Sequence, residues 1–69
     1  MNVGKAISTH RKEWGLTQGE LSSKTRLSRP YISDVENGRY SPSLKSLKIL
    51  ADALELTLSD LLEGVEEAK

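Results

Sequence analysis

The stretch of sequence that decides the fold is LTQGELSSKTRLSRPYISDVENGR, residues 16–39. It predicts two short helices joined by a turn of three or four residues. The first helix begins at Thr17, because Thr17 and Glu20 have the spacing of a capping box. The second begins at Ser28, a favoured N-cap residue, and Pro30 is tolerated in its first turn, where backbone amides lack helical partners.

Apolar spacing predicts which faces of these two helices are buried. Leu21 faces the core from the first helix, and Ile32 and Val35 do so from the second at i, i+3. Leu27 is the apolar residue of the turn and is expected to fill the angle between the helices. Gly38 ends the second helix; an Asn-Gly pair is also a hairpin signal, but apolar spacing of three rather than two favours a helix end.

A further helix is predicted before this stretch, from an apolar face with three- and four-residue spacing. The residues of that face are Val3, Ala6, Ile7, His10 and Trp14. We expect His10 to lie at the boundary of the face rather than to bind a ligand. Gly15 is typical of a left-handed cap at the end of such a helix.

Two more helices are predicted after the stretch. The fourth begins near Ser43, and its apolar face consists of Leu44, Leu47, Leu50, Ala51 and Leu54. The fifth begins at Thr57, which forms a second capping box with Asp60, and Gly64 ends it. Its apolar residues are Leu58, Leu61 and Leu62.

Length and composition limit the kind of protein this is. The chain has 69 residues, no cysteine and one histidine, which predicts a single domain over residues 1–69 without disulfides or a conventional zinc site. Its core spans 3–63 and a short acidic tail spans 65–69. No apolar run approaches the roughly 18 residues of a membrane helix, and the N-terminus lacks the apolar segment of a secretory signal. We therefore expect an all-α, cytoplasmic protein with no membrane association, metal or other cofactor.

Charge is distributed unevenly along the chain, although ten basic side chains balance ten acidic ones. Residues 1–40 contain seven Lys or Arg and four Asp or Glu, a net charge of +3, whereas residues 41–69 contain three and six, a net charge of −3. Proteins that bind nucleic acid are usually basic overall. Because its first half is basic, the chain could still contact DNA phosphates there. Its balanced total charge predicts only modest non-specific affinity for DNA.

Several short motifs occur along the chain in a characteristic order and spacing. They are Gln18, Glu20-Leu21, Tyr31-Ile32-Ser33, Val35-Glu36-Asn37-Gly38, Pro42-Ser43-Leu44 and Leu61-Leu62. In that order and spacing they resemble the signature of the phage-repressor and Cro family of helix-turn-helix proteins, the Xre family, over residues 3–63. The resemblance implies a five-helix, lambda-repressor-like fold with the helix-turn-helix in helices 2 and 3.

The resemblance also implies a function. It predicts a transcriptional regulator, a repressor more than an activator, that binds double-stranded DNA as a homodimer on a palindromic operator. Such proteins act in the bacterial nucleoid or are encoded by phages and plasmids. The alternative is a protein-interaction module on the same fold, such as an antitoxin or the target of an anti-repressor. No catalytic arrangement is visible, so we do not expect an enzyme, and no small-molecule ligand is evident.

Candidate base-reading residues lie on or near the third helix. They are Arg29, Ser33, Pro30, Ser28 and Asp34. Arg29 can donate two hydrogen bonds to guanine O6 and N7, although it could instead contact a phosphate or stay in solvent. Ser33 is short enough for a close approach to a base edge, and Pro30 offers only apolar contact. Asp34 could accept from cytosine N4 or pair with a neighbouring arginine.

Candidate contacts to the DNA backbone lie at both ends of the two-helix unit. They are Thr17, Gln18 and Tyr31 and, as the resemblance implies for the end of the third helix, Asn37, Gly38 and Arg39. The first turn of the second helix offers unpaired amides and a positive dipole end to a phosphate, and Gln18 adds a side-chain donor. Gln18 could also be an ordinary polar residue of that turn, and Tyr31 could be a half-buried packing residue.

The resemblance assigns the remaining candidates to structure and assembly. Arg11 and Glu36 occupy positions that often form an internal ion pair. The dimer interface is expected from a set of apolar residues in and after helix 5: Leu58, Leu61, Leu62 and Val65. Relatives often have glycine where Glu55 stands, so either Glu55 adopts a positive φ or the connection between helices 4 and 5 differs.

Overall fold

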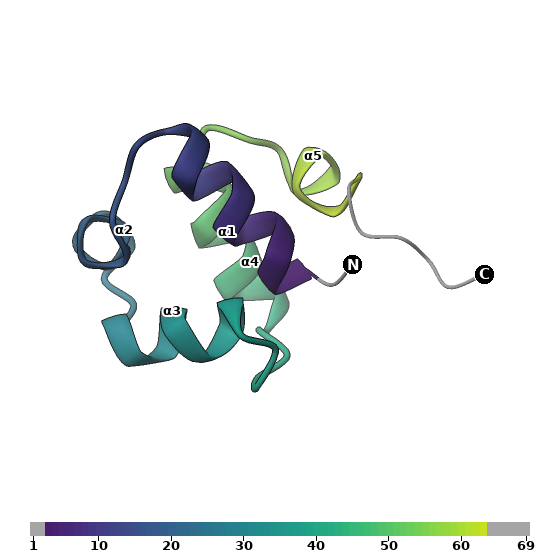
Figure 1. The fold of residues 1–69 in the computed structure, drawn as a ribbon. Helices are drawn as coiled ribbons and strands as arrows, with labels where there is room; N and C mark the ends of the chain where they lie inside the picture. The colour runs from purple at the N-terminus through teal and green to yellow at the C-terminus, as the bar shows by residue number, and fades with distance from the viewer. Residues whose placement is uncertain (1–2, 64–69) are drawn as a thin grey trace.

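The computed structural model describes residues 3–63, with the side chain of Glu63 left out, and within them every regular element is an α-helix. The helices are α1 (Val3–Glu13), α2 (Gln18–Thr25), α3 (Arg29–Glu36), α4 (Leu44–Ala53) and α5 (Leu58–Glu63). In Figure 1, α1 passes in front of α4, α3 crosses the bottom of the molecule, and α2 is seen nearly end-on beside them. The predicted all-α class and the five helices are confirmed. Val65 and the rest of the tail lie outside the described residues.

Four of these helices have an N-terminal side-chain cap at the residue that the sequence predicts. The Thr17 hydroxyl accepts from the Glu20 amide at 3.0 Å while the Glu20 carboxylate accepts from the Thr17 amide at 2.8 Å. Thr57 and Asp60 exchange the same two bonds at the start of α5. Ser28 and Ser43 cap α3 and α4 through their hydroxyls. Each cap satisfies an amide that the helix itself leaves without a partner.

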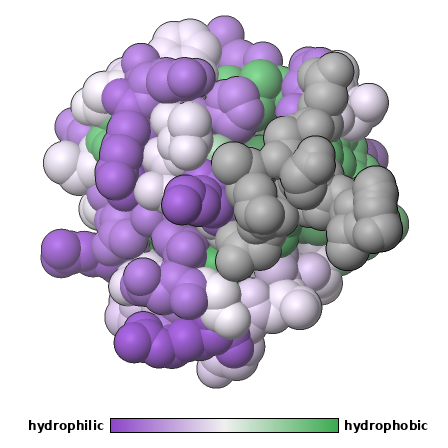
Figure 2. All heavy atoms as spheres, turned by 45° about the vertical axis from the view of Figure 1, so that its right-hand side comes forward, coloured by the Kyte–Doolittle hydropathy of each residue, from purple (hydrophilic) through white to green (hydrophobic). Residues whose placement is uncertain are grey.

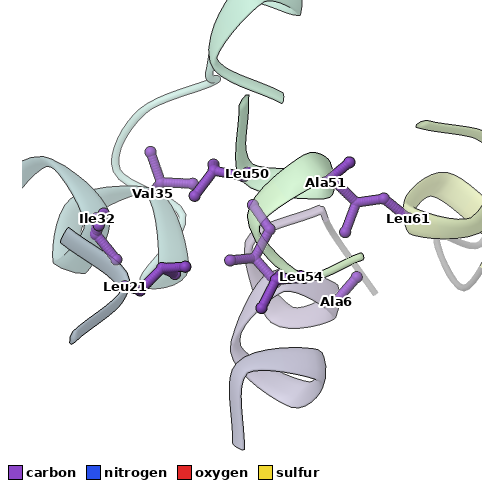
Figure 3. Close-up of a cluster of buried hydrophobic side chains, with 9 residues drawn as sticks. Ala6, Leu21, Ile32, Val35, Leu50, Ala51, Leu54 and Leu61 are labelled. Carbon is purple, nitrogen blue, oxygen red and sulfur yellow. The ribbon is translucent and has the colours of Figure 1, made fainter. Parts of the chain in front are cut away.

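All five helices contribute to one apolar core (Figure 3). Its members are Ala6, Ile7, Leu21, Ile32, Val35, Leu50, Ala51, Leu54 and Leu61. Leu27 packs against this core from the turn between α2 and α3. The predicted orientation of Leu21, Ile32 and Val35 is confirmed. Because α2 and α3 share one buried cluster, the angle between them is set by packing rather than by the turn alone.

Two large apolar residues lie at the surface rather than in the predicted faces. Trp14 is 52% exposed and Leu44 is 65% exposed. Trp14 follows the last residue of α1, and its indole N–H donates to the backbone oxygen of Leu54 at 2.8 Å. Leu44 is the first residue of α4, whereas the buried residues of this helix, Leu50 and Ala51, and its buried C-cap Leu54 lie in its second half and at its end. The predictions that placed Trp14 and Leu44 on buried faces are therefore wrong.

Left-handed backbone conformations occur at four described positions. Gly15 has φ 73° and Gly38 has φ 79°, as expected where α1 and α3 end. Glu55 has φ 59°, so the first of the two alternatives for this position is the one observed. Arg26, the C-cap of α2, has φ 65°, which the sequence reading did not anticipate. An L-residue in this region is strained relative to glycine.

Candidate nucleic-acid interface

The turn between α2 and α3 is held by side-chain hydroxyls. The Thr25 hydroxyl donates to the Leu21 carbonyl at 2.9 Å and accepts from the Leu27 amide at 3.1 Å. The Ser22 hydroxyl donates to the Leu27 carbonyl at 2.6 Å, and the Arg26 amide donates to the Ser22 carbonyl at 2.8 Å. These bonds and the shared core join α2 and α3 into one unit. The orientation of α3 relative to α2 is thereby fixed.

The outward face of α3 is polar. The helical period places Pro30, Ser33 and Asp34 opposite the buried Ile32 and Val35. At the N-terminal end, Ser28, Arg29 and Pro30 are exposed, whereas Ser33 and Asp34 are half-buried. No hydrogen bond or ion pair joins the Arg29 side chain to another described residue. Its guanidinium is therefore available to a ligand at this end of the helix.

A buried carboxylate connects α1, α2 and α3. The Glu36 carboxylate accepts from Arg11 Nε at 2.8 Å and from Arg11 Nη2 at 3.1 Å, and the Arg11 and Glu36 side chains are only 10% and 6% exposed. Arg11 Nη1 donates to the Leu16 carbonyl at 2.7 Å. The expected internal ion pair is thus present, with the two-point geometry that makes an arginine–carboxylate pair directional.

Gln18 belongs to the same network. Its Nε2 donates to Glu36 Oε1 at 3.0 Å, a contact that the sequence reading did not identify. A carboxamide nitrogen has two hydrogens, so one donor of Gln18 remains after this bond is made. The neighbouring Arg11–Glu36 pair thereby restricts the orientation of the Gln18 side chain at the start of α2.

At the other end of α3, the candidate backbone-contact residues bend back onto the helix. Asn37 Nδ2 donates to the Ser33 carbonyl at 2.8 Å and to the Ser33 hydroxyl at 3.4 Å. Arg39 Nη1 donates to Asp34 Oδ1 at 3.3 Å. Of the two readings of Asp34, the pairing with a neighbouring arginine is the one observed. Both half-buried residues of the outward face are therefore covered by residues that follow the helix.

Two aromatic rings join the same region. The rings of Tyr31 and Tyr40 have centroids 5.8 Å apart and planes 32° apart. Tyr31 is half-buried, whereas Tyr40 is 54% exposed. The sequence singled out Tyr31 as a candidate but gave no role to Tyr40. This contact holds the segment after α3 against the helix.

The apolar residues expected at a dimer interface divide between core and surface. Leu61 is fully buried in the core, so it has no surface to offer a second subunit, and its assignment to the interface is wrong. Leu58 is half-buried, and Leu62 is 41% exposed. Val65 lies outside the described residues. Figure 2 turns the α5 side of the molecule forward and shows hydrophobic surface there beside more extensive hydrophilic surface.

Two features that would point to other functions are absent from the described residues. No group of three His, Cys, Asp or Glu side chains in residues 3–62 is arranged to hold a metal ion. No helix in the described part of the chain has the length and apolar character that crossing a membrane requires.

Two helices fixed at an angle, with a polar outward face on the second, define the class of helix-turn-helix DNA-binding domains. The helix-turn-helix family model matches residues 7–61, and the chain belongs to this family. The family consists of DNA-binding transcriptional regulators and not of enzymes. The resemblance drawn from the sequence is confirmed.

Named relatives support this assignment. The chain is 48% identical over 59 residues to an immunity repressor protein of Bacillus phage phi105, covering 86% of this chain and 41% of the relative. It is 46% identical over 66 residues to the transcriptional regulator DdrOP3 of Deinococcus deserti, covering 96% of this chain and 51% of the relative. The chain thus spans about half the length of these curated relatives.

A solved structure shows the same arrangement of helices. The restriction-modification controller protein C.AhdI from Aeromonas hydrophila superposes with a TM-score of 0.83 at 32% identity, covering 86% of this chain and 89% of that chain. The fold of this chain is therefore shared with that controller protein.

Proposed function

We propose that this chain is the sequence-specific DNA-binding domain of a transcriptional repressor, which binds a palindromic operator as a homodimer with α3 in the major groove. The observation that carries the proposal is the α2–turn–α3 unit, whose second helix has a polar outward face. At the exposed end of that face, the Arg29 side chain has no partner among the described residues. The phage repressor and the transcriptional regulator among the relatives support the same function.

Base reading is assigned to the first part and the outward face of α3. Arg29 would donate to guanine O6 and N7, the commonest specific contact of an arginine in the major groove. Ser28 and Ser33 are short hydroxyl donors that allow close approach, and Pro30 would touch a thymine methyl group. Asp34 is the one outward carboxylate of the helix, and it would accept from cytosine N4.

Backbone contacts are assigned to the flanks of the unit. At the start of α2, the helix dipole, Thr17 and the remaining donor of Gln18 would face one phosphate. At the end of α3, Asn37, the Gly38 amide and Arg39 would face another, with the Tyr31 hydroxyl as a further donor. Such contacts position the helix but carry no sequence information.

Dimerisation is assigned to the exposed part of α5 and the residues after it. Leu62 supplies exposed apolar surface, Leu58 lies beside it half-buried, and Val65 would extend the patch. A two-fold dimer would place two copies of α3 about 34 Å apart, in successive major grooves.

The proposal is tested by selecting bound sites from random duplex DNA and titrating salt on a selected and a scrambled duplex. We expect a palindromic consensus, and an affinity ratio between the two duplexes of about 10³ or more. Micromolar or weaker binding to every duplex at low salt would reject the DNA-binding role. It would favour a protein-interaction module, the alternative that the balanced net charge supports.

A further inference from the structure

The outward face of α3 carries a carboxylate that is already occupied. Asp34 Oδ1 accepts from Arg39 Nη1 at 3.3 Å, and the Arg39 amide donates to the Asp34 carbonyl at 2.8 Å. The ring contact between Tyr31 and Tyr40 lies one turn earlier on the helix and holds the adjacent residue of the same segment. Arg39 is therefore kept beside Asp34 by its own backbone bond and by its neighbour.

The ion pair is exposed enough to exchange its partners. The Arg39 side chain is 67% exposed and the Asp34 side chain is 33% exposed. Ion pairs at such positions add little stability, because water and salt compete with both charges. A phosphate can therefore replace Asp34 as the partner of Arg39 at small cost, but Asp34 then loses its only partner in the described structure.

An unpartnered Asp34 would find few donors in DNA. In the major groove, guanine and thymine present only acceptors at their polar edges. Cytosine presents the N4 amino group alone, whereas adenine presents its N6 amino group beside the N7 acceptor, which repels a carboxylate. A carboxylate near phosphates and base acceptors is repelled by both. The loss of Arg39 is compensated only where a base amino group lies opposite Asp34.

We propose that Asp34 is a specificity-determining residue that acts mainly by weakening binding to wrong sequences. Away from the operator, Asp34 neutralises Arg39 and repels DNA. At the operator, a cytosine amino group replaces Arg39 at the carboxylate, and Arg39 moves to a phosphate. This inference rests on the proposed entry of α3 into the major groove. It gives Asp34 a role distinct from that of Arg29, which strengthens binding to the correct sequence.

The test compares Asp34→Asn with Asp52→Asn in the full chain. Both variants lose one negative charge, and Asp52 is exposed on α4, outside the helix-turn-helix. The probes are the duplex selected by the unaltered chain and a scrambled duplex of equal length, each at several salt concentrations. Thermal unfolding of both variants checks that they remain folded.

We expect Asp34→Asn to tighten binding to the scrambled duplex about three- to tenfold at low salt and to raise the log–log salt slope by about 0.9, the value of one added phosphate contact. The ratio of selected to scrambled affinity should fall about fivefold or more. Asp52→Asn should change both affinities equally and leave the ratio unchanged. In an Arg39→Gln background, Asp34→Asn should no longer raise the salt slope, because there is no Arg39 to release to a phosphate; only the gain from relieving direct repulsion should remain.

Two negative outcomes have different meanings. If the unaltered chain selects a site but Asp34→Asn keeps the affinity ratio, or matches Asp52→Asn, the role of Asp34 is rejected and the proposed function stands. If the unaltered chain selects no sequence, the proposed function fails and the inference fails with it. A repeated selection with Asp34→Asn should lose the preference for cytosine at one position of each half-site.

Discussion

Gly4 of α1 lies directly against the carbonyl of Val35 in α3. A Cβ atom at Gly4 would overlap the Val35 carbonyl oxygen and lie 3.1 Å from the Glu36 Cα, and all of these are backbone atoms. Backbone cannot rotate away as a flexible side chain can, so α1 and α3 approach this closely only because residue 4 lacks a side chain. The position of α3 therefore depends on a glycine 25 residues away from its first residue, Arg29.

Gly4→Ala should lower the free energy of unfolding by about 1–3 kcal/mol, the usual cost of overpacking a core. The matched control is Gly19→Ala in α2, where the new Cβ would be 3.7 Å from the Thr17 hydroxyl, an ordinary contact. That control should be neutral or stabilising by up to about 1 kcal/mol, because alanine favours helix. Urea unfolding measures both. An unchanged midpoint for Gly4→Ala would show that the two helices can move apart without cost.

Arg11→Met should destabilise the fold by about 3–5 kcal/mol, because it leaves the buried Glu36 carboxylate without its charged partner. The double variant Arg11→Met with Glu36→Met should recover a large part of this loss, since it removes the buried charge as well. Urea unfolding of the unaltered chain, the two single variants and the double variant gives the coupling between the two residues. A single-variant loss below about 1 kcal/mol would mean that water reaches Glu36.

Glu55→Gly should stabilise the fold by about 1 kcal/mol, because φ 59° is unfavourable for an L-residue and ordinary for glycine. Lys48→Gly is the control, since Lys48 is exposed within α4, where glycine should cost about 0.5–1 kcal/mol. Thermal unfolding should therefore move in opposite directions for the two variants. Equal destabilisation would contradict the left-handed conformation at Glu55.

Arg29→Ala should weaken binding to the selected duplex by about 1–3 kcal/mol and relax the preference at one base pair. Lys48→Ala removes the same charge from α4 and should leave the base preference intact. Binding to a panel of single-base substitutions of the selected site measures the effect. An equal loss on every sequence would assign Arg29 to a phosphate instead.

Leu62→Glu should shift the chain from dimer to monomer without unfolding it, because Leu62 is exposed on α5. The same change at Leu61 should unfold the domain, since it would place a charge in the core. Sedimentation over a concentration series and circular dichroism distinguish these results. A chain that is monomeric at every concentration before any substitution would remove α5 as the interface.

Much of the fold could be predicted because its signals are local in sequence. The capping boxes at Thr17 and Thr57 need only a side chain and an amide three residues away, and helical spacing placed Ile32 and Val35 correctly. The Arg11–Glu36 pair joins distant residues and was accessible only through the resemblance to a family.

The remainder depends on contacts between segments far apart in sequence. Spacing alone placed Trp14 in the core, since it could not show that the Leu54 carbonyl would hold the indole at the surface. Nor could it show that Gly4 meets Val35, or that Gln18 shares the Glu36 carboxylate. For the candidate site, residue types indicated which side chains face outward, but only the fold shows that Asn37 and Arg39 cover Ser33 and Asp34.

The hydrogen bond from the Trp14 indole to the Leu54 carbonyl makes tryptophan fluorescence an intrinsic probe of folding. Trp14 is the single tryptophan of the chain, and it lies beyond the end of α1 opposite to Gly4, roughly 15 Å from that contact by the 1.5 Å rise per residue. Its fluorescence should therefore follow the packing of the end of α1 against the end of α4. With a dye on the duplex, one sample yields the folded fraction from the protein and the bound fraction from the DNA. A variant that is poorly folded can then be told apart from one that is folded and cannot bind.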